Sequence, residues 1–265
     1  KIKGRKPNFS RSPRFAFAKV NERGDKGMTH LITIANKNFI LMASDTRLNY
    51  HEEIIENGDK YQLIRSVADC CRKTFFLEKA RIGIQFMGIG YLKGIDGRKY
   101  HLFHFLSQIE NGIKEDDAIR LKFYKIYKNL RKITTPGDTS NYVNGVMAGF
   151  YENIPYIATF NTFNNEDYLR IFKIPDLSFV DSENILNLEK LKQLRTENEI
   201  VKVINNTIKS SSKKKFHLIG EEVEILKITN QGAYYIQEGK KLFFDNYDEL
   251  MYCFKNNLSS INGQI

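Results

Sequence analysis

The sequence contains no apolar run near the roughly 20 residues that a membrane-spanning helix needs. Its basic N-terminal segment also lacks the apolar central block of a secretory signal peptide. These two absences argue against a helical membrane protein and against a secreted one. We therefore expect a soluble protein of the cytoplasm with no membrane partner.

Cysteine is scarce, because the chain has only Cys70, Cys71 and Cys253. Two of the three are neighbours in sequence, which rarely bridge to each other, and no Cys-x-x-Cys pair is present. An odd number of cysteines in this arrangement excludes a disulfide framework and a structural zinc site. It indicates a reducing compartment.

Cofactor and metal motifs are equally weak. His101 and His104 stand three residues apart, but no Asp or Glu accompanies them at ligand spacing, so an ordinary pair on one helix face is the better interpretation. The stretch GIGYLKG is not a dinucleotide fingerprint, since its third glycine comes one place late. We expect no cofactor and no metal.

The net charge of +10 is concentrated at one end of the chain. Residues 1–27 hold nine Lys or Arg against two acidic residues, so they carry +7 and the remaining 238 residues only +3. Such a leader, mixed with Pro, Ser and Gly, predicts a flexible arm or a removable segment, and nucleic-acid binding is the less favoured interpretation. We expect residues 1–28 to be an extension and residues 29–265 to form a single domain, a size that one core can support.

Apolar alternation begins abruptly at Thr29. The stretches THLITIA and FILMASDTR, separated by NKN, predict two strands joined by a hairpin. After a polar stretch from Asn49 to Asp69, RKTFFLE and IGIQFMG predict a second strand pair. Two further pairs are expected from YVNGVMAGFY with PYIATFNT, and from EVEILKIT with GAYYIQ.

Helical spacing separates these strand pairs. Residues 98–112 and 115–133 predict two long helices, and the second has a stripe made of Ile119, Phe123, Ile126, Tyr127 and Leu130. Shorter helices are expected over residues 188–195 and 197–209, followed by a polar turn at Lys213 to Lys215. Helices that follow strand pairs, rather than alternating with single strands, indicate the α+β class.

The stretch GMTHLITIANKNFILMASDTR resembles the opening of the proteasome-like family of N-terminal-nucleophile hydrolases. A threonine opens the first strand, and the second ends in apolar-Ala-Ser-Asp-x-Arg, which places Asp45 16 positions after Thr29. The unit RKTFFLEKARIGIQFMG is similar to the next part of that family's pattern, with Lys73 as its lysine and Gly88 as the glycine after its strand.

The resemblance covers roughly residues 29 to 240 as a pattern. It implies a four-layer α-β-β-α sandwich of two antiparallel sheets between helix layers. It also implies a threonine-type peptidase that acts on peptides or unfolded proteins, assembles into rings as a homo- or hetero-oligomer, and works with an ATPase partner.

Two features depart from the family's pattern. The segment between Asp45 and Lys73 is about a dozen residues longer than the pattern match predicts, so Lys60 is an alternative for the lysine. The sequence also has no Ser-Gly-Ser-like turn and no clear Asp-x-x-Ser, from which the family draws further support for its site.

The candidate residues are suited to nucleophilic catalysis. A threonine hydroxyl needs a base, and a threonine at the start of a chain has one in its own α-amine. An ammonium such as that of Lys73 would keep this amine neutral and stabilise a developing alkoxide, while Asp45 would orient the lysine. A backbone N–H near Gly88 could serve as an oxyanion donor. A strand edge beside Thr29 would suit an extended peptide substrate.

The mechanism requires removal of residues 1–28, because Thr29 is internal in the chain. Self-cleavage, or translation from Met28 followed by loss of that methionine, would expose the amine. Three alternatives remain open: a non-catalytic structural or gating subunit that retains its extension, a basic protein that binds an acidic partner through its leader, and ordinary structural roles for Thr29, Asp45 and Lys73.

Overall fold

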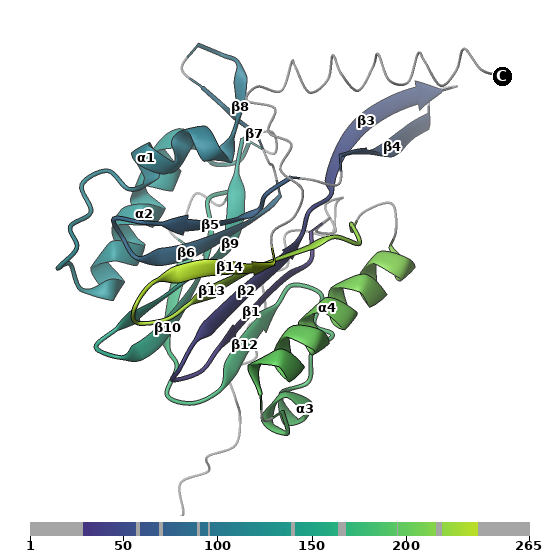
Figure 1. Ribbon diagram of the computed structural model, residues 1–265. Helices are drawn as coiled ribbons and strands as arrows, with labels where there is room; N and C mark the ends of the chain where they lie inside the picture. The colour runs from purple at the N-terminus through teal and green to yellow at the C-terminus, as the bar shows by residue number, and fades with distance from the viewer. Residues whose placement is uncertain are drawn as a thin grey trace, which may run out of the picture.

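The computed structural model describes residues 29–237 except 57–58, 69–70, 89–90, 95, 139–140, 164–167, 195 and 216–218, with backbone only for 48–68 and 88. The predicted leader at residues 1–28 and two of the cysteines, Cys70 and Cys253, lie outside this part of the chain. Its main body consists of two five-stranded antiparallel sheets that face each other (Figure 1).

The first sheet has the order β12-β1-β2-β13-β14. Its strands are β1 (Leu31–Ala35), β2 (Ile40–Asp45), β12 (Ser178–Asp181), β13 (Val223–Ile228) and β14 (Ala233–Gln237). The predicted opening hairpin is confirmed, because β1 pairs with β2 from Leu31 opposite Ser44 to Ala35 opposite Ile40. Since every residue of both strands is buried, the hairpin lies in the interior of the sheet and not at its rim.

The second sheet has the order β11-β10-β9-β6-β5. Its strands are β5 (Thr74–Leu77), β6 (Ile82–Gly88), β9 (Val143–Tyr151), β10 (Ile154–Asn161) and β11 (Tyr168–Lys173). The strand pairs predicted from RKTFFLE with IGIQFMG and from YVNGVMAGFY with PYIATFNT are confirmed here. The pair predicted near the end of the described chain, β13 with β14, is confirmed in the first sheet.

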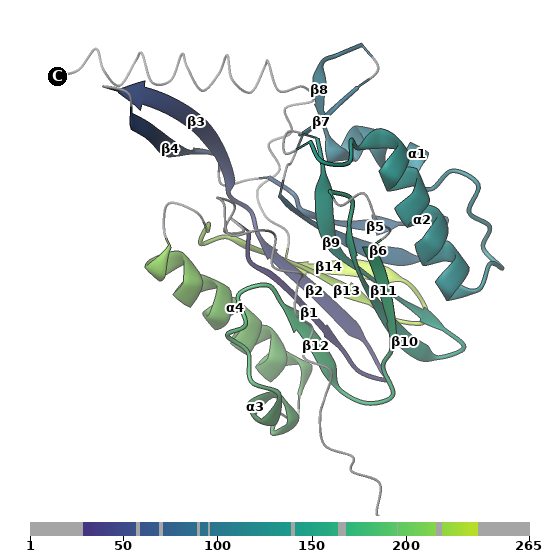
Figure 2. The same cartoon turned by 180° about the vertical axis from the view of Figure 1, so that it is seen from behind.

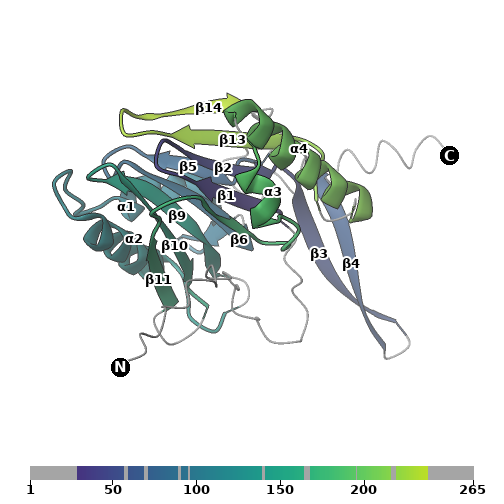
Figure 3. The same cartoon turned by 90° about the horizontal axis from the view of Figure 1, so that it is seen from below.

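One substantial helix packs against each of the two sheets in the described part of the chain (Figures 2 and 3). The helical elements are the 3-10 helix η1 (Leu102–Phe105) and the α-helices α1 (Leu106–Ile109), α2 (Ile119–Ile133), α3 (Leu188–Lys192) and α4 (Glu197–Lys214). The stripe predicted for α2 is confirmed, because its five apolar residues are all buried. Helix α4 begins at a capping box, in which Thr196 and Glu199 each accept the other's backbone N–H.

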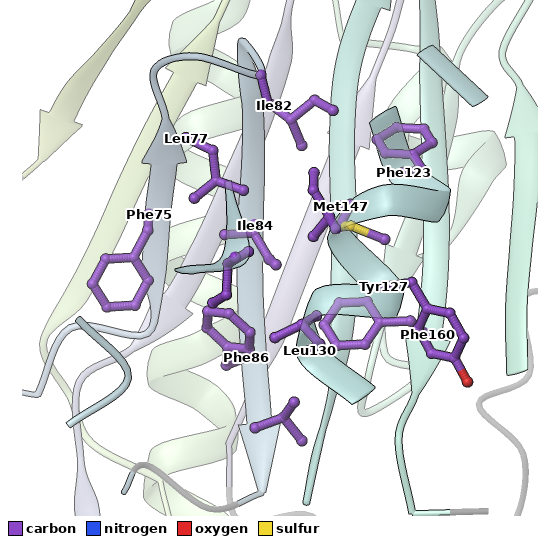
Figure 4. Packing of buried hydrophobic residues seen from close by; sticks show 14 of the residues in the cluster. Phe75, Leu77, Ile82, Ile84, Phe86, Phe123, Tyr127, Leu130, Met147 and Phe160 are labelled. Atoms are coloured by element: carbon purple, nitrogen blue, oxygen red, sulfur yellow. The ribbon is translucent and has the colours of Figure 1, made fainter. Parts of the chain in front are cut away.

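Three apolar clusters hold these layers together. One lies between the second sheet and α2, where Phe123, Tyr127 and Leu130 of the helix meet Ile84 and Met147 of the strands (Figure 4). A second joins the first sheet to α4, and a third fills the space between the sheets. The sheets approach closely at Gly83, where an added Cβ would lie 2.4 Å from Met42 Sδ. Glycine is required there by space and not by backbone conformation.

The predicted fold class is wrong. The described part of the chain is mostly β, unlike an α+β four-layer sandwich with helix layers outside the sheets. Among the residues that the structure describes, strand residues outnumber α-helical residues about two to one, and only the helices α2 and α4 exceed five residues. Each sheet is therefore backed by one substantial helix rather than by a layer of helices.

Two misread segments account for this difference. The helix predicted over residues 98–112 is instead β8 (Lys99–His101), η1 and the single turn α1, because the segment first forms a hairpin with β7 (Tyr91–Lys93). His101 then starts the helical turns as an N-cap, and Gly112, at φ of 73°, follows α1 after a short turn. The polar stretch from Asn49 to Asp69 is a hairpin of β3 (Leu48–Glu56) with β4 (Asp59–Ala68). Figure 1 shows this hairpin projecting from the sheets.

The later helices also differ from their predicted bounds. Helix α3 ends three residues early, whereas α4 continues past its predicted end at Lys209 as far as Lys214, within the predicted polar turn at Lys213 to Lys215. Ser211 and Ser212 are buried, so this last turn packs against the protein. Within the described ranges, no helix is long and apolar enough to cross a membrane.

Candidate active site

Asp45 is the centre of the candidate site. It is the last residue of β2 and is fully buried. Its Oδ1 accepts the backbone N–H of His30 at 2.8 Å, and its Oδ2 accepts the N–H groups of Arg47 and Gly220, each at 3.1 Å. The side chain of Lys73 donates to the same Oδ2 at 3.0 Å. Four donors from four parts of the chain therefore converge on one carboxylate.

Lys73 is the cation that compensates the charge of the buried Asp45 carboxylate. It directly precedes β5 and is 8% exposed, so both members of the ion pair are removed from water. A buried carboxylate is expensive unless a cation and hydrogen bonds compensate it, and here both are present. The Lys73 carbonyl accepts the Phe86 N–H at 2.9 Å, which fixes the backbone beside β6. Two of the predicted residues, 28 positions apart, are thus in direct contact.

The alternative lysine, Lys60, lies elsewhere. It belongs to β4 and pairs with Ile55, one position from the last pair of the β3–β4 ladder, Glu56 with Asp59. β3 starts at Leu48, three residues after Asp45, and Lys60 pairs with a residue seven positions further along β3. At the rise of an extended strand, Lys60 is therefore on the order of 20 Å from the start of β3. The long segment between Asp45 and Lys73 is used for the hairpin, and Lys73 returns to the sheet after it.

Thr29 lies two residues before the start of β1 and directly before His30, the residue whose N–H Asp45 accepts. Its carbonyl accepts a hydrogen bond of 3.2 Å from Ser182 Oγ, and that oxygen accepts the Leu31 N–H at 2.9 Å. Thr29 is 5% exposed in the intact chain. The start of β1 is therefore clamped between Asp45 and Ser182, which positions Thr29 at the same end of the sheet as the ion pair.

Gly88 is the last residue of β6, where it pairs with Val143 of β9. Near the end of β6, Gln85 pairs with Thr74, and the Phe86 N–H donates to the Lys73 carbonyl. The end of β6 therefore lies on the same side of the molecule as Lys73. The structure thus brings Asp45 and Lys73 into contact, places Thr29 one residue from that contact, and leaves Gly88 at the neighbouring strand end.

A second buried pair holds the residue that follows Thr29. His30 Nε2 contacts Asp181 Oδ1 at 2.8 Å, and both side chains are buried. Asp181 also accepts the backbone N–H groups of Glu183, Ile185 and Leu186. Burial raises the pKa of this carboxyl, but the hydrogen bond and charge of His30, together with the backbone donors of Leu186 and Glu183, outweigh it and leave the pKa below its ordinary value.

Polar contacts also join the two sheets directly beneath the ion pair. Thr33 donates to Gln85 Oε1 at 2.7 Å, and Gln85 Nε2 donates to Ala43 O at 2.9 Å and to Thr74 Oγ1 at 3.1 Å. Ser44 and Thr74, the sequence neighbours of Asp45 and Lys73, are 3.0 Å apart at their hydroxyls. Because this network is buried and internally hydrogen-bonded, it fixes the register of β2 against β5.

Sequence reasoning missed Ser182, Asp181 and Gly220. The sequence has no Ser-Gly-Ser-like turn and no clear Asp-x-x-Ser, and the serine that contacts Thr29 comes directly after Asp181, at the end of β12. Two adjacent polar residues after a partly buried strand were the only local signal. Gly220 offered none, because it contributes a backbone N–H from a loop 175 positions away.

His101 and His104 were predicted to be an ordinary pair on one face of a helix rather than metal ligands. The structure does not place them together on one helix face. His101 ends β8 and caps η1, whereas His104 lies within η1. Across the residues that the structure describes, no three His, Cys, Asp or Glu side chains are grouped to hold a metal ion.

No protein-family model matches the chain, and no curated protein is significantly similar to it. The interpretation of the site therefore depends on its geometry and on the resemblance of its opening motif.

The lowered pKa of Asp181 makes a pH-dependent contribution to stability. Because the pKa of Asp181 is lower in the folded protein than the unfolded value of about 3.9, ionised Asp181 stabilises the fold above pH ~4. This stabilisation is lost as the pH falls through the folded pKa. Asp181→Asn should lower the free energy of unfolding at pH 7 by about 1 to 3 kcal/mol, because an amide cannot accept all four donors. Urea unfolding at pH 7 and pH 3 should show this difference shrinking at the lower pH.

Asp176→Asn is the matched control, since Asp176 is exposed in the loop between β11 and β12. It should change stability little at either pH. An Asp181→Asn protein as stable as the wild type at pH 7 would contradict the role assigned to the pair.

Proposed function

We propose that the protein is a threonine-type amidohydrolase, with Thr29 as its nucleophile once Thr29 is the first residue of the chain. The observation that carries this proposal is the buried ion pair of Asp45 and Lys73, 3.0 Å long, on the carboxylate that also binds the N–H of His30. Asp45 holds the residue after Thr29 and also holds Lys73, so a threonine, a carboxylate and a fixed cation, the group types that nucleophilic catalysis needs, belong to one linked set.

The reaction uses the chain's own groups in a fixed order. The free α-amine of Thr29 removes the hydroxyl proton, and Oγ attacks the amide carbon of the substrate. The Lys73 ammonium disfavours a protonated α-amine and stabilises negative charge on the attacking oxygen. A backbone N–H at the end of β6, near Gly88, donates to the substrate oxyanion, an effect typically worth about 3 to 4 kcal/mol. The protonated amine returns its proton to the leaving nitrogen, and water then hydrolyses the ester.

Peptides and unfolded proteins are the substrates that we propose for this site. The expected added-strand contact with β1 is wrong along Leu31–Ala35, because β1 is already paired with β12 on one side and β2 on the other. A bound peptide therefore has to reach Thr29 at the end of β1, where the strand pairing stops. An amide other than a peptide bond would meet the same nucleophile.

The resemblance of the opening motif to proteasome-like N-terminal-nucleophile hydrolases supports a ring assembly, an ATPase partner and a cytoplasmic location as parts of the same proposal. A second candidate function is a non-catalytic structural or gating subunit that keeps residues 1–28. The burial of Thr29 in the intact chain favours this second candidate for as long as the extension is attached.

N-terminal sequencing and the intact mass of the protein purified from its native source distinguish the two functions. The hydrolase requires a chain that begins Thr-His-Leu-Ile. A chain in which Met28 still precedes Thr29 has no α-amine at the site, and that result would replace the hydrolase with the structural subunit.

A further inference from the structure

A thiol and an imidazole that the proposed hydrolase does not use are in contact beside its site. Cys71 Sγ lies 3.4 Å from His101 Nε2. Cys71 is 8% exposed and His101 5%, so the contact is shielded from bulk water. The cysteine precedes β5, and the histidine ends β8, which brings two separate parts of the chain together.

The hydrogen bonds of His101 determine which ring nitrogen carries the proton. His101 Nδ1 accepts the backbone N–H of Phe103 at 3.3 Å, so Nδ1 is the bare nitrogen in the neutral ring. The proton is then on Nε2, the atom that faces Cys71. Tyr91 lies edge-on to the ring, with centroids 5.4 Å apart, and Phe75 packs at 6.1 Å, so the ring orientation is fixed by packing.

This tautomer excludes a dyad of the cysteine-hydrolase kind. In such a dyad the imidazole nitrogen next to sulfur must be bare in order to take the thiol proton. Here the neutral ring presents an N–H to sulfur instead. A hydrogen bond donated to sulfur stabilises the thiolate, which is the nucleophilic and oxidisable form.

Cys71 is also tied to the candidate hydrolase site through its backbone. Its N–H donates to the Thr46 carbonyl at 2.8 Å, and Thr46 follows Asp45. Lys73 is only two residues further along the chain and holds Asp45. Any group added to Cys71 Sγ therefore has to be accommodated in the packed segment that positions the ion pair.

We propose that Cys71 is a modification site, oxidised to a sulfenic acid by hydrogen peroxide, the smallest member of the hydroperoxide class. The thiolate sulfur attacks one peroxide oxygen, so an S–O bond forms and the O–O bond breaks. Sulfur is oxidised and the peroxide is reduced by the same two electrons. The departing hydroxide takes up the proton that the thiol has lost and leaves as water. A small oxidant suits a thiol that is 8% exposed.

Oxidation also regulates the threonine site, a consequence that rests on the proposed function. The added oxygen displaces the segment from Cys71 to Lys73 and weakens the contact of Lys73 with Asp45. Peroxide should then slow amide hydrolysis, and a thiol reductant should restore it, because a sulfenic acid is reversible.

The test uses the full chain with Cys70→Ser and Cys253→Ser, so that Cys71 is its only cysteine. The protein is treated with hydrogen peroxide, dimedone traps the sulfenic acid, and mass spectrometry follows the adduct over time. Adduct formation at Cys71 should be about tenfold slower in the His101→Leu variant, which has no donor, the loss expected for one hydrogen bond to a charged sulfur. His104→Leu, three residues away, is the matched control and should leave the rate unchanged.

A second comparison does not depend on folding of the variant. Cys71 should react about tenfold faster in the folded protein than in the same protein unfolded in urea, because only the folded chain supplies the His101 contact. A rate equal to or slower than that of the unfolded chain, or an unchanged rate in a folded His101→Leu protein, would overturn the proposal. These readouts do not require hydrolysis, so they stand even if the threonine site proves inactive.

Discussion

Thr29→Ala, in a chain that starts at residue 29, should abolish amide hydrolysis. The alanine retains the α-amine and the backbone contact with Ser182, but it removes the only atom that we assign to attack the substrate. Loss of the nucleophile in hydrolases of this chemistry lowers kcat by very large factors, so we expect a fall of about 10³-fold or more. Steady-state hydrolysis of a fluorogenic peptide library is the measurement.

Thr29→Ser is the matched control for that variant. A serine keeps the hydroxyl and loses only the β-branching methyl, so its activity should remain within roughly one order of magnitude of the wild type. Both variants should have wild-type thermal stability within about 0.5 kcal/mol, since the hydrogen bond of Thr29 found among the described residues uses its backbone carbonyl and not its side chain. Hydrolysis that persists in Thr29→Ala would show that another group is the nucleophile.

Lys73→Met should destabilise the fold as well as remove activity. The variant leaves the Asp45 carboxylate buried without a cation, and breaking a buried ion pair in this way typically costs about 3 to 5 kcal/mol. Three backbone donors still hold Asp45, which favours the lower end of that range. Equilibrium urea unfolding measures the stability, and peptide hydrolysis measures the activity.

The control for charge alone is Lys79→Met, since Lys79 is exposed in the turn that follows β5. It should change the free energy of unfolding by less than about 0.5 kcal/mol. The Asp45→Asn, Lys73→Met double variant should recover part of the lost stability, because it no longer buries an uncompensated charge. A Lys73→Met protein that is fully stable and active would contradict the role of the ion pair in both fold and chemistry.

The local pattern of the sequence predicted the elements that carry the site. Alternation from Thr29 to Asp45 predicted the β1–β2 hairpin, because both strands are apolar on both faces and the NKN turn interrupts them. The run RKTFFLE likewise predicted β5, which places Lys73 at its entrance. Spacing within one hairpin is a short-range property, so the sequence determines it directly.

Long-range relationships could not be predicted in the same way. Nothing local shows that Lys73 rather than Lys60 reaches Asp45, since the choice depends on how the intervening hairpin leaves the sheet. The dipeptide Asn57-Gly58 between two strand-like runs is a strong hairpin signal that the polar composition of the segment obscured. Ser182 and Gly220 reach the site from 153 and 175 positions away, respectively, through tertiary folding alone.

The error in fold class has a physical cause of the same kind. Residues 98–112 have helical spacing, but pairing of β8 with β7 competes for the start of the segment, and the capping bond of His101 delays the first helical turn. Propensity is a weak prior when tertiary contacts compete with it. With that helix reduced to single turns and the β3–β4 hairpin added, the described chain is mostly β.

Capture of Thr29 by a threonine-directed electrophile tests the central claim most directly. The protein from its native source would be incubated with a peptide boronate or a β-lactone, and the adduct mapped by mass spectrometry. The account predicts one modified residue, Thr29 at the chain start, with modification abolished in Lys73→Met protein that remains folded. A chain that begins at Thr29 and remains unmodified, with Lys73 and Asp45 intact, would contradict it.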